Sequence, residues 1–164
     1  VLYGILKEEQ PDVVICVGQA GGRPNITVER IAINQDDARI PDNDGKQPID
    51  RSIFEEGPAA YFSTLPIKAM VRDMKEAGIP ASVSNTAGTF VCNHIMYGAL
   101  HYAALHQPSL KAGFVHIPYL PMQTVDKPTM PSMSRDEIVK GLTTLIKTAI
   151  QVEEDVKETG GAVC

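Results

Sequence analysis

The pattern of hydrophobic and polar positions changes period several times along the chain, and each change marks an expected element. Apolar side chains in residues 2–6 share one helical face and precede a polar run, which predicts the last turns of an amphipathic helix that ends at Pro11. Residues 13–17 are continuously apolar and mostly β-branched, which is typical of a central strand covered on both faces. Residues 18–23 then form a glycine-rich loop at the end of that strand.

A second strand is expected over Ile26–Asn34, and it carries an exception to the apolar pattern. Successive side chains of a strand alternate between its two faces, so Glu29 is predicted to share the apolar face of Ile31 and Ile33. A buried carboxylate requires a partner. The commoner explanation is a structural salt bridge or a backbone-bonded glutamate, and the functional one is a carboxylate that orients a histidine.

The remaining elements are three helices and two short strands. Helical periodicity predicts helices over 66–77, 92–107 and 134–150, and short apolar runs predict strands over 79–84 and 113–118. The last helix begins at a capping box, and its predicted apolar face consists of Ile138, Leu142, Leu145, Ile146, Ala149 and Ile150. This order predicts an α/β fold, a three-layer αβα sandwich with a mixed, mostly parallel twisted sheet, in a single domain over residues 1–164.

Composition narrows the class of protein. The net charge of −5 is spread over both signs, so the chain shows no basic footprint for nucleic acid and no polybasic face for a membrane. No apolar run approaches the roughly 18 residues of a membrane-spanning helix. The 3 cysteines are widely spaced and form neither a disulfide framework nor a CxxC metal pattern, which favours a reducing, cytoplasmic setting.

Cys92 is a candidate nucleophile because of its position. It follows a glycine-containing turn, Ser84–Thr89, and opens the helical pattern of residues 92–107. A helix N-terminus presents unpaired N–H groups and the positive end of the helix dipole, and both favour a thiolate. The alternative is a small apolar residue packed beneath the turn. Position alone leaves the two readings equal.

His116 stands at the end of the last predicted strand, where loops carry functional side chains. The other three histidines lie on or near the helix of Cys92, where His94 and His101 are expected to decorate the surface or cap a contact. No pair has the i,i+4 spacing of helix-borne zinc ligands. Four aspartates in the polar loop 36–48 do not fit the EF-hand spacing, so a solvated loop is favoured over a calcium site.

The glycine-rich loop 18–23 leaves a second class of enzyme open. It fits neither the dinucleotide nor the P-loop motif, yet an α/β enzyme that uses it to hold phosphate is one alternative. A non-catalytic binding or assembly module is another. The two alternatives differ from a cysteine enzyme in that neither needs Cys92 and His116 within hydrogen-bond reach of each other.

Glu29, Cys92 and His116 stand in segments that resemble the pyrrolidone-carboxylate peptidases, also called pyroglutamyl-peptidase I. Gly18–Gly21 with Ile26–Asn34 is similar to the family's glutamate signature, and Val83–Asn93 is similar to its cysteine signature. Val115–Pro118 resembles the histidine segment, and Asp37–Asn43 is also typical of the family. These motifs are long, correctly ordered and spread over most of the chain.

The resemblance implies a thiol exopeptidase that removes N-terminal pyroglutamate from peptides through a thioester acyl-enzyme, with Cys92 as nucleophile, His116 as base and Glu29 as its orienting carboxylate. It also implies that Arg39 contacts the oxyanion. Phe90, Val91 and Ile40 are expected to form the slot for the small neutral lactam, and Gln19 is a candidate polar handle for the ring. No cofactor, metal or nucleotide is expected. A homotetramer, without nucleic-acid or membrane partners, is implied by the resemblance.

Members of this family begin with a strand that carries a Gly-Phe-x-Pro-Phe-Gly-like segment, whose aromatic residues contribute to the pyroglutamyl pocket. The sequence begins within a helix and contains no such segment. We therefore expect it to lack the N-terminal strand–loop–helix segment of the family. At the other end, Cys164 is a candidate for a disulfide between subunits in an oxidising buffer.

Overall fold

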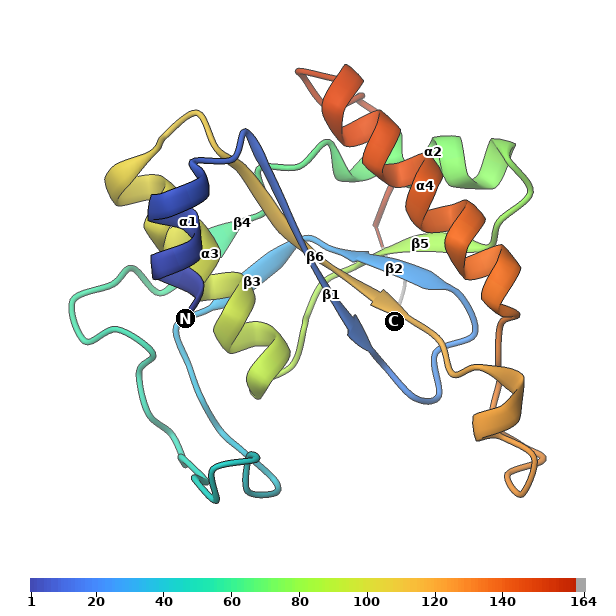
Figure 1. Ribbon diagram of the computed structural model, residues 1–164, viewed down its shortest axis with the longest axis horizontal. Coiled ribbons are helices and arrows are strands. Elements are labelled where there is room, and N and C mark those ends of the chain that lie inside the picture. Colours follow the sequence, from blue (N-terminus) through green and yellow to red (C-terminus); the bar gives the residue numbers. More distant parts are fainter. Residues whose placement is uncertain (162–164) are drawn as a thin grey trace. The chain divides into compact units, whose positions relative to one another are not determined.

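The computed structural model describes residues 1–161. This part of the chain contains four α-helices, six strands and one short 3-10 helix. In chain order they are α1 (Leu2–Glu9), β1 (Val13–Gln19), β2 (Ile26–Glu29), β3 (Ile31–Ile33), β4 (Ala60–Phe62), α2 (Ile67–Glu76), β5 (Ala81–Ser84), α3 (Val91–His106), β6 (Lys111–Ile117), η1 (Pro121–Gln123) and α4 (Arg135–Gln151) (Figure 1).

These elements gather into two compact units. Unit 1 comprises Val1–Cys16, Arg30–Thr64 and Asn85–Phe114. Unit 2 comprises Val17–Glu29, Leu65–Ser84 and the chain from Val115 onward. Each unit is thus assembled from three separate stretches of sequence. The single domain expected over residues 1–164 stays a prediction.

The larger sheet is mixed and has the strand order β1-β6-β2-β5. β2 pairs with β5 in parallel and with β6 in antiparallel, with Glu29 opposite Ser84 and Thr27 opposite His116. The arrows of β1 and β6 point the same way in Figure 1. The predicted α/β fold with a mixed, mostly parallel sheet is therefore confirmed.

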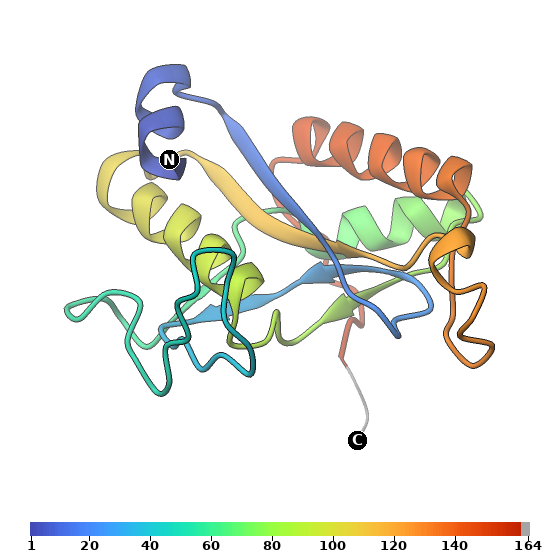
Figure 2. The ribbon, with the colours of Figure 1, turned by 60° about the horizontal axis from the view of Figure 1, so that its bottom comes forward.

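Unit 2 is a layer of two helices on β2 and β5. α2 contacts α4, β5 and β2, and Figure 2 shows the two helices side by side. The apolar side chains of α2 face this layer, and Met70 and Met74 have 0% exposure. Gly78 follows α2, and its positive φ of 78° is a backbone conformation that glycine adopts without strain.

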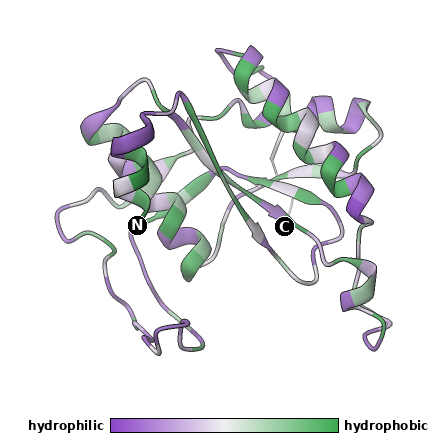
Figure 3. Ribbon diagram, in the orientation of Figure 1, coloured by the Kyte–Doolittle hydropathy of each residue, from purple (hydrophilic) through white to green (hydrophobic). Residues whose placement is uncertain are grey.

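α4 confirms its predicted start and corrects its predicted face. The Ser134 hydroxyl accepts a hydrogen bond from the Glu137 N–H at 3.3 Å, and Glu137 Oε2 accepts one from the Ser134 N–H at 3.1 Å. However, Ile146 and Ile150 are 45% and 64% exposed and do not belong to the buried face. Hydrophobic residues occur all along α4 (Figure 3), so the sequence predicts a wider face than the one that packs.

Unit 1 is built around α3. This helix contacts α1, β3 and β4, and the aromatic and aliphatic side chains of its inner face are fully buried. Asn93 lies among them at 1% exposure. Its Oδ1 accepts a hydrogen bond from the Ile33 N–H at 2.9 Å, and its Nδ2 donates to the carbonyls of Ile33 and Gln35 at 2.9 and 3.0 Å. One polar side chain therefore fixes the first turn of α3 to the end of β3.

The single strand predicted over 26–34 is two strands in two different sheets. The pairing of the larger sheet stops at Glu29, and β3 pairs instead with β4, an antiparallel strand that the sequence analysis does not predict. The interruption is at Arg30, whose carbonyl accepts a hydrogen bond from the Ser63 N–H at 2.8 Å. The alternation argument that placed Glu29 on one face with Ile31 and Ile33 is therefore wrong.

The acidic segment after α4 is not frayed over its described residues. Asp155 Oδ1 accepts a hydrogen bond from the Ala69 N–H at 2.9 Å, and Asp155 Oδ2 accepts one from the Lys68 N–H at 3.0 Å. These are N–H groups of the first turn of α2, which no intrahelical carbonyl can satisfy.

Cys164 lies outside the described residues. None of the helices within residues 1–161 is long and apolar enough to cross a membrane.

We expect Asn93→Ala to lower the free energy of unfolding by about 3 kcal/mol, because it strands buried backbone groups that the amide now satisfies. Urea unfolding followed by circular dichroism measures this. Asn43→Ala, at an exposed asparagine, is the matched control and should change stability little. Equal stability of the two variants would contradict the anchoring role of Asn93.

Candidate functional site

Glu29 and His116 are brought together in unit 2. Glu29 is the last residue of β2 and has 0% exposure, and His116 lies on the neighbouring β6 with 4% exposure. Glu29 Oε1 lies 2.7 Å from His116 Nδ1. The predicted burial of Glu29 is thus correct, and its partner is the histidine that stands 87 residues later in the chain.

A third side chain, Arg23, completes this cluster and was given no role by the sequence analysis. Arg23 Nη1 lies 2.6 Å from Glu29 Oε1 and also donates to the Thr27 hydroxyl. The sequence contained a signal for this residue, because a buried acid requires a cation and Arg23 stands only six residues upstream of Glu29. The same oxygen of Glu29 therefore accepts from an imidazole and a guanidinium.

The glycine-rich loop carries Arg23 and does not form a phosphate cradle. The Ala20 N–H donates to the Ile117 carbonyl at 3.0 Å, which ties the loop to the end of β6. Gly21 lies directly against the Tyr119 ring, which occupies the space that a Cβ atom at residue 21 would need. The loop leads into a strand, whereas a P-loop leads into the N-terminus of a helix. These contacts argue against the phosphate-binding alternative.

Gln19, the predicted handle for the lactam ring, ends β1 in unit 2. Its amide exchanges hydrogen bonds with the amide of Gln123, at 2.7 and 3.0 Å, and its Nε2 lies 3.3 Å from the Pro118 carbonyl. Gln19 is therefore tied to the loop that follows the strand of His116. A substrate that used this amide would exchange at least one of these bonds.

Cys92 is the second residue of α3 in unit 1, as predicted. The turn in front of it contains Gly88, with φ of 82°, and ends at Phe90, the N-cap residue. The first intrahelical bond in this turn runs from the His94 N–H to the Phe90 carbonyl at 2.9 Å. The N–H groups before His94, including that of Cys92, thus have no intrahelical acceptor and can serve an anion.

Cys16, the other described cysteine, has a different environment. It lies within β1, where burial raises the pKa of its thiol. A thiol of raised pKa supplies little thiolate at neutral pH. Of the two, Cys92 is therefore the better candidate nucleophile.

The predicted substrate slot also lies in unit 1. Ile40, Phe90 and Val91 line one hollow of about 320 Å³ beside the start of α3. Arg39 is exposed and lies on the segment next to this hollow. That segment is fixed to the turn before Cys92 by two 2.8 Å bonds, from the Asp37 N–H to the Thr89 carbonyl and from the Thr89 hydroxyl to the Asp37 carbonyl.

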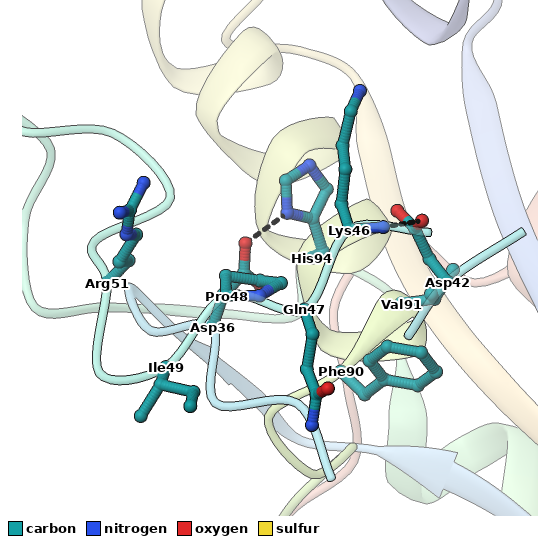
Figure 4. Close-up of a pocket in the computed structure, with 10 residues that line it drawn as sticks. All are labelled: Asp36, Asp42, Lys46, Gln47, Pro48, Ile49, Arg51, Phe90, Val91 and His94. Carbon is teal, nitrogen blue, oxygen red and sulfur yellow. Dashed lines mark hydrogen bonds and ion pairs between the residues drawn. The ribbon is translucent and has the colours of Figure 1, made fainter. Parts of the chain in front are cut away.

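Phe90 and Val91 also border a larger pocket of about 770 Å³ (Figure 4). Within it, His94 Nδ1 lies 2.7 Å from Asp36 Oδ2. His94 is exposed and His101 makes a contact, which are the two alternatives expected for these histidines. The ring centroids of His101 and Phe54 lie 4.2 Å apart, and burial lowers the pKa of the His101 imidazole. Across residues 1–161, no three His, Cys, Asp or Glu side chains gather in a way that could hold a metal ion.

Comparison with known proteins shows the family of the chain. A model of the pyroglutamyl peptidase family matches residues 1–152. Pyrrolidone-carboxylate peptidase from Alkaliphilus oremlandii is 63% identical over 164 residues, which are 100% of this chain and 77% of that protein. The enzyme of the same name from Clostridium perfringens is 60% identical over 97% of this chain and 75% of its own length.

Solved structures give the same result. Pyroglutamyl peptidase I from Bacillus amyloliquefaciens matches with a TM-score of 0.94 and 52% identity, over 96% of this chain and 75% of that one. Pyrrolidone carboxyl peptidase from Thermococcus litoralis matches with a TM-score of 0.93 and 42% identity, over 96% and 76%. The chain belongs to the pyroglutamyl peptidase family, cysteine peptidases that remove N-terminal pyroglutamate from peptides.

Proposed function

We propose that this chain hydrolyses the amide bond after an N-terminal pyroglutamyl residue, with Cys92 as nucleophile, His116 as general base and Glu29 as the carboxylate that orients the histidine. The observation that carries the proposal is the buried 2.7 Å contact between Glu29 Oε1 and His116 Nδ1. A carboxylate at Nδ1 keeps the proton on that nitrogen and places the imidazole lone pair on Nε2.

The reaction follows from these roles. The Cys92 thiol gives its proton to His116 Nε2, and the sulfur attacks the pyroglutamyl carbonyl carbon to form a tetrahedral oxyanion. Collapse of this intermediate breaks the C–N bond, and the imidazolium returns the proton to the leaving amine. Water then attacks the thioester with the same base, which releases pyroglutamate and restores the thiol.

The start of α3 supports the assignment of the oxyanion and the substrate. The Cys92 N–H is one donor for the oxyanion, and the Arg39 guanidinium is the proposed second. The hollow of Ile40, Phe90 and Val91 suits a small, flat, neutral ring, and Gln19 is the proposed polar contact for the lactam. Neither a metal nor a nucleotide has a role in these steps.

We also propose a location and an oligomeric state for this protein. A cytoplasmic location is favoured by cysteines that form no disulfide framework in the sequence. A homotetramer of peptidase domains, each spanning residues 1–164, is inferred from the family resemblance.

We expect sedimentation of the purified protein to give about four times the chain mass, independent of reducing agent. A monomer at micromolar concentration would contradict the tetramer.

Cys92→Ala should abolish hydrolysis of a fluorogenic pyroglutamyl amide, with a loss of at least about a thousandfold in kcat, because no other thiol can replace it. Circular dichroism should show an unchanged fold. The matched control is Cys16→Ala, which removes the other described thiol and should retain turnover. Activity in the Cys92→Ala protein would exclude Cys92 as the nucleophile.

Glu29→Gln keeps the shape of the side chain and removes its charge. We expect kcat to fall about a hundredfold or more, since a neutral amide neither fixes the histidine tautomer nor stabilises the imidazolium. Steady-state kinetics and urea unfolding separate the two explanations of Glu29. A loss of stability with unchanged kcat would favour the structural salt bridge, and Glu56→Gln, at an exposed acid, controls for the change of net charge.

A further inference from the structure

The buried negative charge of Glu29 needs more stabilisation than a hydrogen bond from His116 alone provides. The carboxylate has 0% exposure, and a neutral imidazole offers it one hydrogen bond and no charge. An ionised carboxylate without water or a cation is strongly disfavoured in a protein interior. Among residues 1–161, its Oε2 has no hydrogen-bond partner, and the contacts with Arg23 and His116 both fall on Oε1.

Arg23 supplies the missing charge from a fixed position. Its Nη1 lies 2.6 Å from Glu29 Oε1, and its side chain is only 28% exposed. The same nitrogen donates to the hydroxyl of Thr27, a residue with 5% exposure that stands opposite His116 in the strand register. An arginine remains charged throughout the working range of pH.

The loop that carries Arg23 is itself held against the strand of His116. The Ala20 N–H donates to the Ile117 carbonyl, and the Arg23 N–H donates to the Ala20 carbonyl at 3.4 Å. Gly21 packs against the Tyr119 ring with no space for a Cβ atom. The loop that carries the guanidinium is therefore held by contacts to Ile117 and Tyr119, which follow His116 in the chain.

We propose that Arg23 is a positioning residue of this peptidase, which keeps Glu29 ionised, aims its Oε1 at His116 Nδ1 and sets the proton affinity of the Glu29–His116 pair. The inference rests on the proposed function of that pair. Arg23 acts through the pair and is assigned no contact with substrate. Its removal should therefore change kcat and its pH dependence and leave KM nearly unchanged.

The expected direction with pH follows from the charges around the pair. Arg23 contacts both Glu29 and Thr27, which lie on β2, and His116 on β6 contacts Glu29. Ser84 on β5 stands opposite Glu29, and Thr27 stands opposite His116. Arg23 is the one permanent cation in this set. Loss of a neighbouring positive charge strengthens proton binding by either member of a coupled pair. The limb of the pH–rate profile that reports the pair should therefore move to higher pH.

The test compares Arg23→Gln and Arg23→Lys with wild-type protein and with Arg72→Gln. Arg72 is a matched control, since it is an ion-paired arginine of unit 2 with 35% side-chain exposure, bound to Asp73 and Glu158 instead of Glu29. We expect Arg23→Gln to lower kcat roughly tenfold, as for a lost hydrogen bond to a charged group. Arg23→Lys should fall between, and Arg72→Gln should keep kcat and the profile.

A double-mutant cycle separates this inference from the proposed function. If Arg23 acts through Glu29, Arg23→Gln should lower kcat far less in the Glu29→Gln background than in wild type. Full kcat and an unshifted profile in Arg23→Gln, alongside an impaired Glu29→Gln, would overturn the role of Arg23 alone. Normal turnover of Glu29→Gln would overturn the orienting role itself. If Arg23→Gln does not fold, an unshifted profile in Arg23→Lys, with kcat equal to wild type, rejects the inference.

Discussion

A carboxylate with no exposed surface is the constraint on which the rest of the site depends. Glu29 has lost all contact with water, so donors within the fold must satisfy its charge. Two side chains do so on one oxygen, the His116 imidazole and the Arg23 guanidinium. His116 reaches it only because β6 is inserted beside β2, and Arg23 reaches it only because the preceding loop folds back onto the end of β6. The strand order is therefore a requirement of the site as well as a means of burying apolar surface.

Local features of the site could be predicted from the sequence because they depend on neighbours in the chain. Cys92 lies at the start of a helix as expected, since a glycine turn followed by helical periodicity is a short-range signal. The capping box at Ser134 and the glycine at 78 that follows α2 are signals of the same kind. The burial of Glu29 was predicted correctly for a partly wrong reason. Only Glu29 and Arg30 separate two apolar runs, and periodicity cannot show that the runs belong to different sheets.

The features that could not be predicted depend on contacts between distant segments. Gln19 exchanges hydrogen bonds with Gln123, which stands 104 residues later, so its environment is set by the loop after β6. Arg23 is close to Glu29 in sequence, but its reach depends on the conformation of a glycine-rich loop and on the ring of Tyr119 beneath it. The exposed Ile146 and Ile150 of α4 show the same limit. A periodic apolar stripe indicates which side of a helix can pack, whereas the neighbouring elements decide how much of it does.

The site divides its parts between rigid elements and loops, and this division has a mechanistic consequence. The first turn of α3 is fixed by the three hydrogen bonds of Asn93 to the end of β3, directly beside Cys92. Ile40, in contrast, is 61% exposed on a loop that is joined to the turn before α3 through Asp37 and Thr89. Displacement of this loop therefore need not disturb the N–H groups of the helix. An oxyanion is stabilised best by donors that do not reorganise during the reaction. In the proposed mechanism, the anchoring of α3 on β3 is therefore as much a part of the chemistry as the thiol itself.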